Sequence, residues 1–415
     1  MKPNKRNLKI LLLMLEFPTW KLARSWSYGT GLGIEEGFAA HGVQYLTITT
    51  PWFDRAREIC AGRQFDQVWL DIGRHDHLDE SWLEWIATLA PVRVGLIAES
   101  IFCHSGEDAI QPQFLKWQQN VIQRLKYVTH VVTCDEKDVD HLNGMTSVPA
   151  MWWPMCVPPR ILKASKGGGN DFAVFYGRIY PKRAKWLINP ELEKWLAEPI
   201  SGSNGLSSSF MSKVKYRFLE SFMKGRSSWW AWLKHPELRD IFVNFPSPER
   251  YTAYPLLFNG LHLAVRAFNR TGSPNCDKAL SWYLPMLRLT RRACYAQWLR
   301  ALEVGCAMVN LPHYVKTYAS RVVEGMAVGR PVISWEIPDR PMNKALFEDG
   351  KEILLFQAND PVQLATQIHR VLKDPQLRTR LVANAFKKMK QFHTWDIRIG
   401  QIFRWIDTGE SAQFY

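Results

Sequence analysis

The amino-acid sequence predicts an α/β protein with two doubly wound, Rossmann-like domains. Short apolar and β-branched runs alternate with helical segments along most of the chain, which is typical of βαβ units in a parallel sheet. The 415 residues suffice for two or three hydrophobic cores. Prolines and glycines concentrate at residues 154–170, which marks a boundary between two strand–helix series.

The first series contains five expected strands. It starts with a run that is apolar over residues 10–15, the pattern of a strand covered on both faces. Helices are expected at 34–40, with Glu35 and Glu36 in the first turn, and at 81–89. The expected strands are 8–15, 43–50, 67–72, 92–98 and 127–134.

Two places in this first half are candidate ligand-contacting loops. Gly31 and Gly33 lie between the first strand and the first helix, where a backbone can approach a ligand closely or simply make a tight turn. The glycines at 29, 31 and 33 do not fit the G-x-G-x-x-G spacing of a dinucleotide site. Glu99, Ser100 and His104 follow the fourth strand, at the carboxyl end where α/β sheets bind ligands.

The second series begins with a strand at 171–176 and continues after a long insertion. Its later strands are expected at 306–311, 331–335 and 352–356, and its helices at 361–372 and 375–391. Each of these helices has a proline in its first turn, where the missing N–H costs nothing. Residues from about 195 to 300 read as a helical, basic insertion in this second domain.

The net charge of +14 is concentrated in the middle of the chain, because residues 151–300 hold 23 basic and 9 acidic residues. Within this stretch, 210–232 places Lys213, Lys215 and Arg217 beside phenylalanines at spacing four and ends in tryptophans. Such a segment can lie in a lipid interface, pack on the domain with its lysines in water, or bind nucleic acid.

Several classes of protein and site are disfavoured. No apolar run approaches the roughly 20 residues of a membrane span. The seven cysteines include no C-x-x-C pair, so neither a disulfide framework nor structural zinc is expected. His75, Asp76 and His77 lack a third ligand and read as a solvated loop. We expect a cytoplasmic protein, with peripheral membrane contact left open.

The stretch 318–333 is the most informative part of the sequence. Ser320 is a possible helix N-cap, and a helix N-terminus that faces a cleft is an anion site. Glu324, about one turn further, can accept two hydrogen bonds from a vicinal diol such as a ribose, although a lone glutamate can equally decorate a helix surface.

This stretch resembles the donor-binding signature of the GT-B-fold retaining glycosyltransferases that use nucleotide sugars. Residues 349–356 and 360–361 resemble the next loop, strand and helix start of that family, and 175–183 its Gly-Arg and distal basic residue. The residues that match the signature are Tyr318, Glu324, Met326, Ala327, Gly329, Pro331, Val332 and Ile333.

The resemblance implies an acceptor-side domain at 1–158, a linker at 159–170, a nucleotide-sugar domain at 171–395 across a cleft, and a helix at 396–415 that crosses back. It implies transfer with retention, a nucleotide diphosphate sugar as co-substrate, and neither a cofactor nor a catalytic metal. Arg178 and Arg183 would hold the pyrophosphate and Glu324 the ribose, and His104 would touch the donor sugar. The remaining candidates are Gly177, Lys316, Tyr318, Ser320 and Arg321 for the donor, and Gly31, Gly33, Glu99 and Ser100 for the acceptor side.

The sequence departs from the family pattern at Lys316, which stands where an acidic residue is expected to hold sugar hydroxyls. A lysine there could meet a carboxylated sugar or a phosphate, or point away from the site, which we expect. The sequence does not name the acceptor, and the basic middle segment suggests an anionic or lipid-linked one. The alternative function is a nucleic-acid-binding protein, or a transferase acting on nucleic acid, that uses the basic middle segment.

Overall fold

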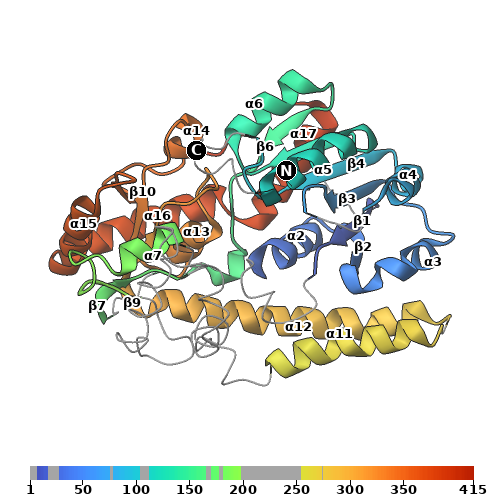
Figure 1. Cartoon of the computed structure of the whole chain (residues 1–415), viewed down its shortest axis with the longest axis horizontal. Coiled ribbons are helices and arrows are strands. Elements are labelled where there is room, and N and C mark those ends of the chain that lie inside the picture. The colour runs from blue at the N-terminus through green and yellow to red at the C-terminus, as the bar shows by residue number, and fades with distance from the viewer. Residues whose placement is uncertain are drawn as a thin grey trace.

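The computed structural model describes residues 7–16, 28–74, 78–102, 112–164, 170–176, 181–197, 254–272 and 274–415. Two α/β domains lie side by side, each built on one parallel sheet, and a pair of long helices runs beneath them (Figure 1). The stretches 103–111, 177–180 and 198–253, which contain His104, Gly177, Arg178 and the segment 210–232, lie outside the described residues.

The N-terminal sheet has six parallel strands in the order β2-β1-β3-β4-β5-β6. The first five lie within three residues of the ranges expected from the sequence, while the short β6 was not expected. Burial is complete along β3, and the middle of β1 is buried, because helices cover both faces of the sheet. The strands are β1 (Lys9–Met14), β2 (Gln44–Thr49), β3 (Gln67–Asp71), β4 (Val92–Ile97), β5 (His130–Thr133) and β6 (Ala150–Trp152).

Helices connect the successive strands of this parallel sheet, as in a doubly wound fold. Asp79 and Asp135 cap α4 and α6 by accepting hydrogen bonds from the backbone N–H groups of Trp82 and Lys137. The helices of this half are α2 (Tyr28–Ala40), α3 (Ala56–Cys60), α4 (Glu80–Leu89), α5 (Pro112–Arg124) and α6 (Glu136–Met145), with short 3₁₀ turns η1 (Thr50–Arg55), η2 (Leu125–Tyr127) and η3 (Pro159–Ile161).

The C-terminal sheet has five parallel strands in the order β11-β10-β9-β7-β8. Prolines open α15 and α16 as expected, and Asp360 and Asp374 cap these two helices. The elements are β7 (Asn170–Val174), α7 (Pro181–Leu187), β8 (Leu196–Ala197), β9 (Gly305–Asn310), α13 (Ser320–Ala327), β10 (Val332–Trp335), α14 (Pro341–Ala345), β11 (Leu354–Phe356), α15 (Pro361–Lys373) and α16 (Pro375–Phe392).

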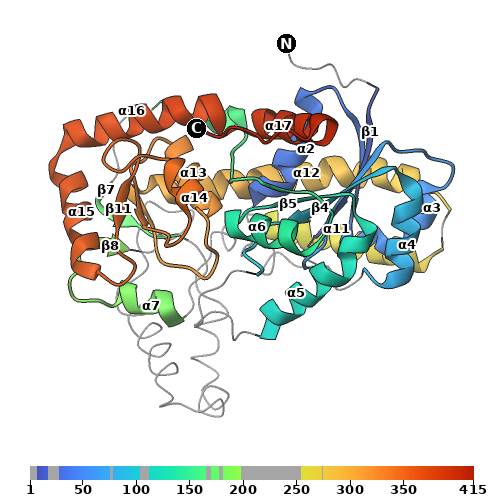
Figure 2. The same ribbon diagram turned by 90° about the horizontal axis from the view of Figure 1, so that it is seen from above.

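The last helix, α17 (Trp395–Thr408), returns to the N-terminal domain and lies on α2 (Figure 2). Phe403 stacks on Phe38 with ring centres 6.0 Å apart and meets the edge of Trp69 at 5.9 Å. The chain crosses between the domains near residue 160 and again at 393–395. There the Val157 N–H donates to the carbonyl oxygen of His393, and the Trp395 N–H donates to the carbonyl oxygen of Val157.

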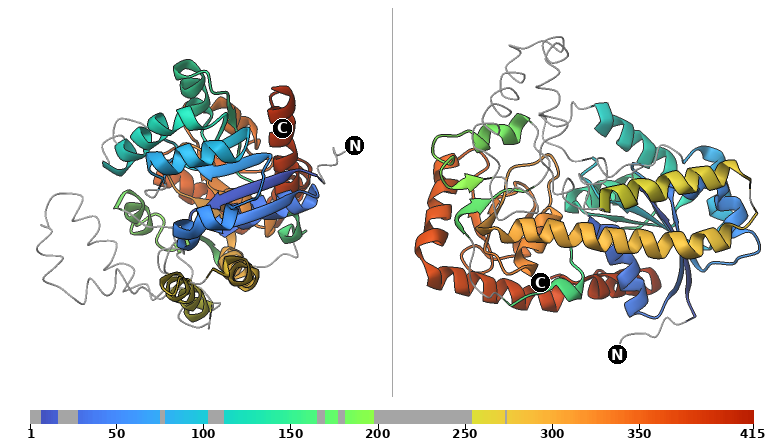
Figure 3. Two further views of the ribbon diagram at one scale, coloured as in Figure 1. Left: turned by 90° about the vertical axis from the view of Figure 1, so that its right-hand side faces the viewer. Right: turned by 90° about the horizontal axis from the view of Figure 1, so that it is seen from below.

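The insertion folds in part into a helical hairpin, α11 (Tyr254–Arg270) and α12 (Cys276–Glu303). Although it is inserted in the sequence of the second domain, this hairpin packs on the first. The helix α12 contacts α2 and α3, and α11 contacts η1, while the C-terminal end of α12 reaches α13 and β9 (Figure 3). The expectation that the insertion belongs to the second domain is therefore incomplete: α12 bridges both.

The expected loop position of Gly31 and Gly33 is wrong, because both residues lie inside α2. A Cβ on Gly31 would fall 1.9 Å from Met14 of β1 and 2.4 Å from Arg291 of α12, and a Cβ on Gly33 would fall 1.9 Å from the Trp395 indole nitrogen of α17. These glycines therefore allow close packing of helices. None of the described helices combines the length and apolar character that crossing a bilayer requires.

Candidate functional site

The C-terminal sheet reverses its strand order between β7 and β9, and side chains gather at the carboxyl ends of these two strands. In open α/β sheets this switch point is where ligands bind. Arg321 of α13 spans it: its Nε donates to the carbonyl oxygen of Tyr176, just after β7, at 3.1 Å, and its Nη1 donates to Oδ1 of Asn310, at the end of β9, at 3.1 Å.

A second arginine lies at the same place. The guanidinium carbons of Arg183 and Arg321 lie 5.1 and 5.3 Å from the centre of the Phe175 ring. Arg183, on α7, is fully buried, and its Nε lies 3.4 Å from the Pro312 carbonyl oxygen. Two planar, permanently charged groups at the end of β7 provide the charge and the geometry that recognise phosphate.

Glu324 lies on α13 and is only 1% exposed. Its Oε2 accepts a hydrogen bond of 2.7 Å from the indole Nε1 of Trp298, near the C-terminal end of α12. The ring of Trp298 stands 4.5 Å from that of Tyr176, at an interplanar angle of 37°. Trp298 and Tyr176 were not among the expected site residues, because nothing in the sequence relates 298 to 324.

Two details of α13 and its surroundings differ from expectation. Ala319 is the N-cap, with no side-chain cap, so Ser320 is the first helical residue and not the cap. Tyr318, an expected donor-binding residue, is buried against Phe347, and this burial raises the pKa of its hydroxyl. Burial, followed by the nearby Glu324 carboxylate, also raises the pKa of Tyr295 on α12.

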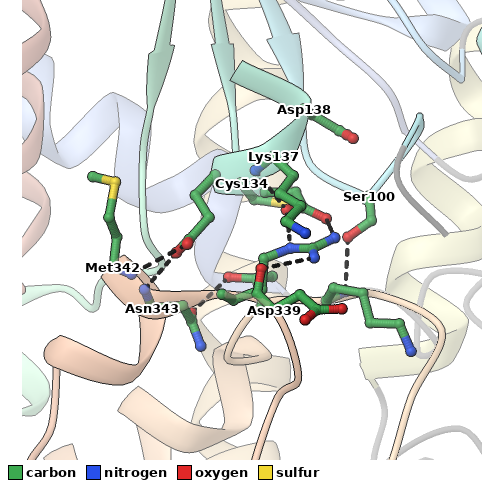
Figure 4. Close-up of polar contacts among 12 residues, drawn as sticks. Ser100, Cys134, Lys137, Asp138, Asp339, Met342 and Asn343 are labelled. Carbon is green, nitrogen blue, oxygen red and sulfur yellow. Dashed lines mark hydrogen bonds and ion pairs between the residues drawn. The ribbon is translucent and has the colours of Figure 1, made fainter. Parts of the chain in front are cut away.

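Two expected site residues from opposite domains meet in the structure. The Oγ of Ser100, a fully buried side chain after β4, accepts a hydrogen bond of 2.7 Å from the backbone N–H of Lys316 (Figure 4). The Lys316 ammonium lies 5.1 Å from the centre of the Trp335 ring, and the residue is 8% exposed. The lysine is therefore buried where the domains meet and does not extend into solvent. Glu99 lies 3.5 Å from Arg74.

Beside this contact, the start of α6 binds the start of α14 across the domain boundary (Figure 4). Asp135 and Arg340 form a buried bidentate pair at 2.5 and 3.0 Å. The Glu136 carboxylate accepts hydrogen bonds from the backbone N–H groups of Met342, at 3.1 Å, and Asn343, at 2.5 Å. Burial raises the pKa of Glu136 although these two hydrogen bonds act in the opposite direction.

Asn343 carries this contact on to the segment before α13. Its Oδ1 accepts hydrogen bonds from the backbone N–H of Tyr318 at 3.1 Å and from the hydroxyl of Thr317 at 3.2 Å. Asp339, which directly precedes Arg340, has a φ of 56°, an uncommon conformation for a residue with a side chain. Asp135 and Glu136 follow the end of β5 after one intervening residue, and acidic residues just after a strand are the sequence signal that could have identified them.

Comparison with known proteins agrees with this architecture. Anabaena HepE in complex with UDP-glucose superimposes with a TM-score of 0.52 at 12% identity, over 97% of this chain and 100% of that one. Sucrose-phosphate synthase from Thermosynechococcus elongatus gives 0.54 at 12% identity, with the same coverage. The protein has the GT-B glycosyltransferase fold.

Sequence comparison finds a glycosyltransferase match in the later part of the chain. Residues 265–404, which include Trp298, Arg321 and Glu324, match the family described as glycosyl transferase-like. A D-inositol 3-phosphate glycosyltransferase of Streptomyces bingchenggensis is 31% identical over 101 residues, which is 24% of this chain. The match spans one fifth of that relative's length.

Proposed function

We propose that this GT-B protein is a glycosyltransferase that moves a sugar from a nucleotide diphosphate sugar to an acceptor. The observation that carries the proposal is the position of Glu324. It is a buried carboxylate about one turn along α13 from Arg321, whose guanidinium lies against the same Phe175 ring as that of Arg183. It also lies within the segment that matches the glycosyl transferase-like family. Anabaena HepE, which shares the fold, was crystallised with UDP-glucose and with UDP and glucose.

In the proposed complex, Glu324 accepts hydrogen bonds from the ribose hydroxyls, and Arg183 and Arg321 lie toward the diphosphate. Transfer places negative charge on the departing diphosphate, and guanidinium groups that are already in position stabilise that charge without reorganising. The family resemblance implies that Arg178 would add a further positive charge at the diphosphate. This charge arrangement is the basis for proposing that no catalytic metal is required.

Retention follows from the resemblance to the retaining enzymes of this fold. The acceptor hydroxyl would attack the face that the leaving diphosphate vacates, and a diphosphate oxygen would take the hydroxyl proton. The glycosidic bond forms as the bond between the anomeric carbon and the diphosphate breaks. His104 keeps its proposed place beside the donor sugar, and Glu99 and Ser100 theirs on the acceptor side. Lys316, which is buried where the domains meet, is not assigned a contact with the sugar.

The acceptor class rests on the basic middle of the chain. We propose an anionic or lipid-linked acceptor, with membrane contact through residues 210–232, which lie outside the described structure. Binding of nucleic acid by the same segment is the competing proposal. Co-sedimentation with anionic but not neutral vesicles supports the first, and salt-sensitive RNA or DNA binding without sugar-nucleotide turnover supports the second.

The test begins with calorimetric titration of UDP, GDP and ADP, followed by turnover of the corresponding nucleotide sugars with and without EDTA. Glu324→Gln should weaken nucleotide binding by roughly ten- to a hundredfold, since one hydrogen bond to a charged group contributes about 1.5–3 kcal/mol. Arg183→Lys should weaken binding of the diphosphate more than of the nucleoside, because lysine keeps the charge but loses the planar fork.

Glu348→Gln is a suitable control, because Glu348 is exposed on the same domain and its side chain pairs with Lys351 at the surface. It should bind nucleotides as the wild type does. If Glu324→Gln binds and turns over donors like the wild type, the assignment of Glu324 is wrong. Strict dependence on a divalent metal would contradict the proposed charge arrangement.

A further inference from the structure

One face of α12 meets three buried carboxylates, two from the N-terminal domain and one from the C-terminal domain. Arg288 binds Glu35 of α2 through two hydrogen bonds of 2.8 and 2.9 Å. Arg291 pairs at 2.7 Å with Glu16, just after β1. Trp298 donates at 2.7 Å to Glu324. Positions 288, 291 and 298 recur on one side of a helix with 3.6 residues per turn.

The three partners differ in chemistry. Arg288 occupies both oxygens of Glu35 and neutralises its charge, and Arg291 likewise supplies a full positive charge to Glu16. Trp298 supplies a single neutral N–H. An indole N–H orients a carboxylate by occupying one lone-pair direction of Oε2, but it leaves the negative charge in place. Trp298 therefore holds the Glu324 carboxylate without converting it into an ion pair, and the hydroxyl of Tyr295, also on α12, is a second neutral group that interacts with it.

The indole is itself held in place. Its ring packs at 4.5 Å on Tyr176, which directly follows β7, and the carbonyl oxygen of Tyr176 accepts the Nε–H of Arg321. The direction of the indole N–H is thus fixed by the same switch point that presents the two arginines. A glutamate side chain turns through a broad terminal torsion, so one fixed donor on Oε2 selects the plane of the carboxylate.

We propose that Trp298 is a positioning residue for ribose recognition: its indole N–H sets the plane of the Glu324 carboxylate so that the vicinal hydroxyls of a nucleoside diphosphate can donate to it. The proposal rests on the proposed function. It assigns a role in donor specificity to α12, a helix that otherwise packs largely on the acceptor-side domain.

The test uses Trp298→Phe, which removes the N–H and keeps a ring against Tyr176. Calorimetry with UDP and 2′-deoxy-UDP, or the guanosine or adenosine pair if those bind more tightly, measures the ribose contribution. The variant should bind the ribonucleotide about tenfold more weakly, as expected for one lost hydrogen bond to a charged group, while binding of the deoxynucleotide changes little. The ratio between the two nucleotides should therefore fall toward one.

Two controls separate positioning from folding. Trp282→Phe makes the same substitution on the exposed side of α12, where the residue is 41% exposed, and should leave the ratio unchanged. In a Glu324→Gln background, Trp298→Phe should add almost nothing to the loss, because its effect passes through that carboxylate. Thermal melting of each variant checks the fold, and Trp298→His, which keeps a ring N–H, should retain part of the discrimination.

The outcomes distinguish the two proposals. If the wild type prefers the ribonucleotide, Glu324→Gln abolishes the preference and Trp298→Phe retains it, the positioning role is wrong while the donor site stands. Equal losses for both nucleotides, or full additivity with Glu324→Gln, also overturn it. A wild type that binds none of these nucleotides overturns the proposed function and this inference together.

Discussion

Gly33 lies where α2 touches the first turn of α17, and the contact leaves no room for a side chain. A Cβ on this glycine would lie 1.9 Å from Nε1 and 2.1 Å from Cε2 of Trp395. Trp395 is 2% exposed and packs its ring against Trp153 at 5.7 Å. The indole is therefore confined on both sides, and a methyl group would have to displace a packed aromatic ring.

Gly33→Ala should lower the free energy of unfolding by about 1–3 kcal/mol, the usual cost of overpacking a core, and chemical denaturation measures it. The matched control is Gly260→Ala in α11, where an added Cβ meets nothing within 4 Å. That change should stabilise the protein by up to about 1 kcal/mol, because alanine restricts the unfolded chain and favours helix. Equal stability of the two variants would show that α17 does not pack on α2 as described.

At the scale of elements, α12 attaches the insertion to both domains. Its 28 residues span roughly 42 Å at 1.5 Å per residue, which is long enough to lie along both domains. Arg291 of α12 and Glu16 are 7% and 2% exposed, so their ion pair has little contact with water. A buried pair fixes relative position strongly, because loss of one partner leaves a charge without compensation in a medium of low dielectric.

Arg291→Met should therefore destabilise the protein by about 3–5 kcal/mol, measured by urea denaturation. Replacing both partners, with Glu16→Leu and Arg291→Met together, should restore much of this loss, since two apolar side chains of similar volume avoid the cost of desolvation. Lys351→Ala, which breaks an exposed pair with Glu348, should change stability by less than about 1 kcal/mol. If the double variant is no more stable than Arg291→Met, the pair does not act as an isolated unit.

At the scale of the whole molecule, several connections fix the two domains relative to each other. They are α12, the crossing segment that leads into α17, and the contact of Asp135 and Glu136 with α14. Two buried histidines lie on or beside these connections: His393 in the crossing segment, and His262 on α11 near Arg291 of α12. His262 of α11 is 2% exposed, and burial, followed by the charges of Arg291 and Arg266, lowers its pKa to about 4. Burial also lowers the pKa of His393.

These histidines predict acid sensitivity. Between the ordinary pKa of 6.5 and about 4, the unfolded chain binds a proton at His262 and the folded chain does not, so stability falls as the pH falls. The contribution of one such group is about 1.4 kcal/mol per pH unit. Urea denaturation at pH 7.5 and 5.0 should show a smaller loss for His262→Leu than for the wild type. The same loss in both would mean that His262 is protonated in the folded protein.

The sequence by itself determined the elements that local patterns specify. Buried parallel strands are apolar on both faces, so β1, β3, β4 and β9 are readable as continuous runs. Proline and aspartate at helix starts act within four residues, so α15 and α16 were located closely. The stretch 318–333 combines a helix start, Glu324 and a following strand, which led to the GT-B expectation that the structural comparison confirms.

Only the tertiary structure decided which partners these elements meet. The pairing of Trp298 with Glu324, of Arg291 with Glu16 and of Arg340 with Asp135 joins residues that no local period relates. The same holds for Gly31 and Gly33, whose role depends on α12 and α17 arriving from far along the chain. Helical periodicity shows that a face is buried but not what covers it, because long-range packing depends on the shapes of both partners.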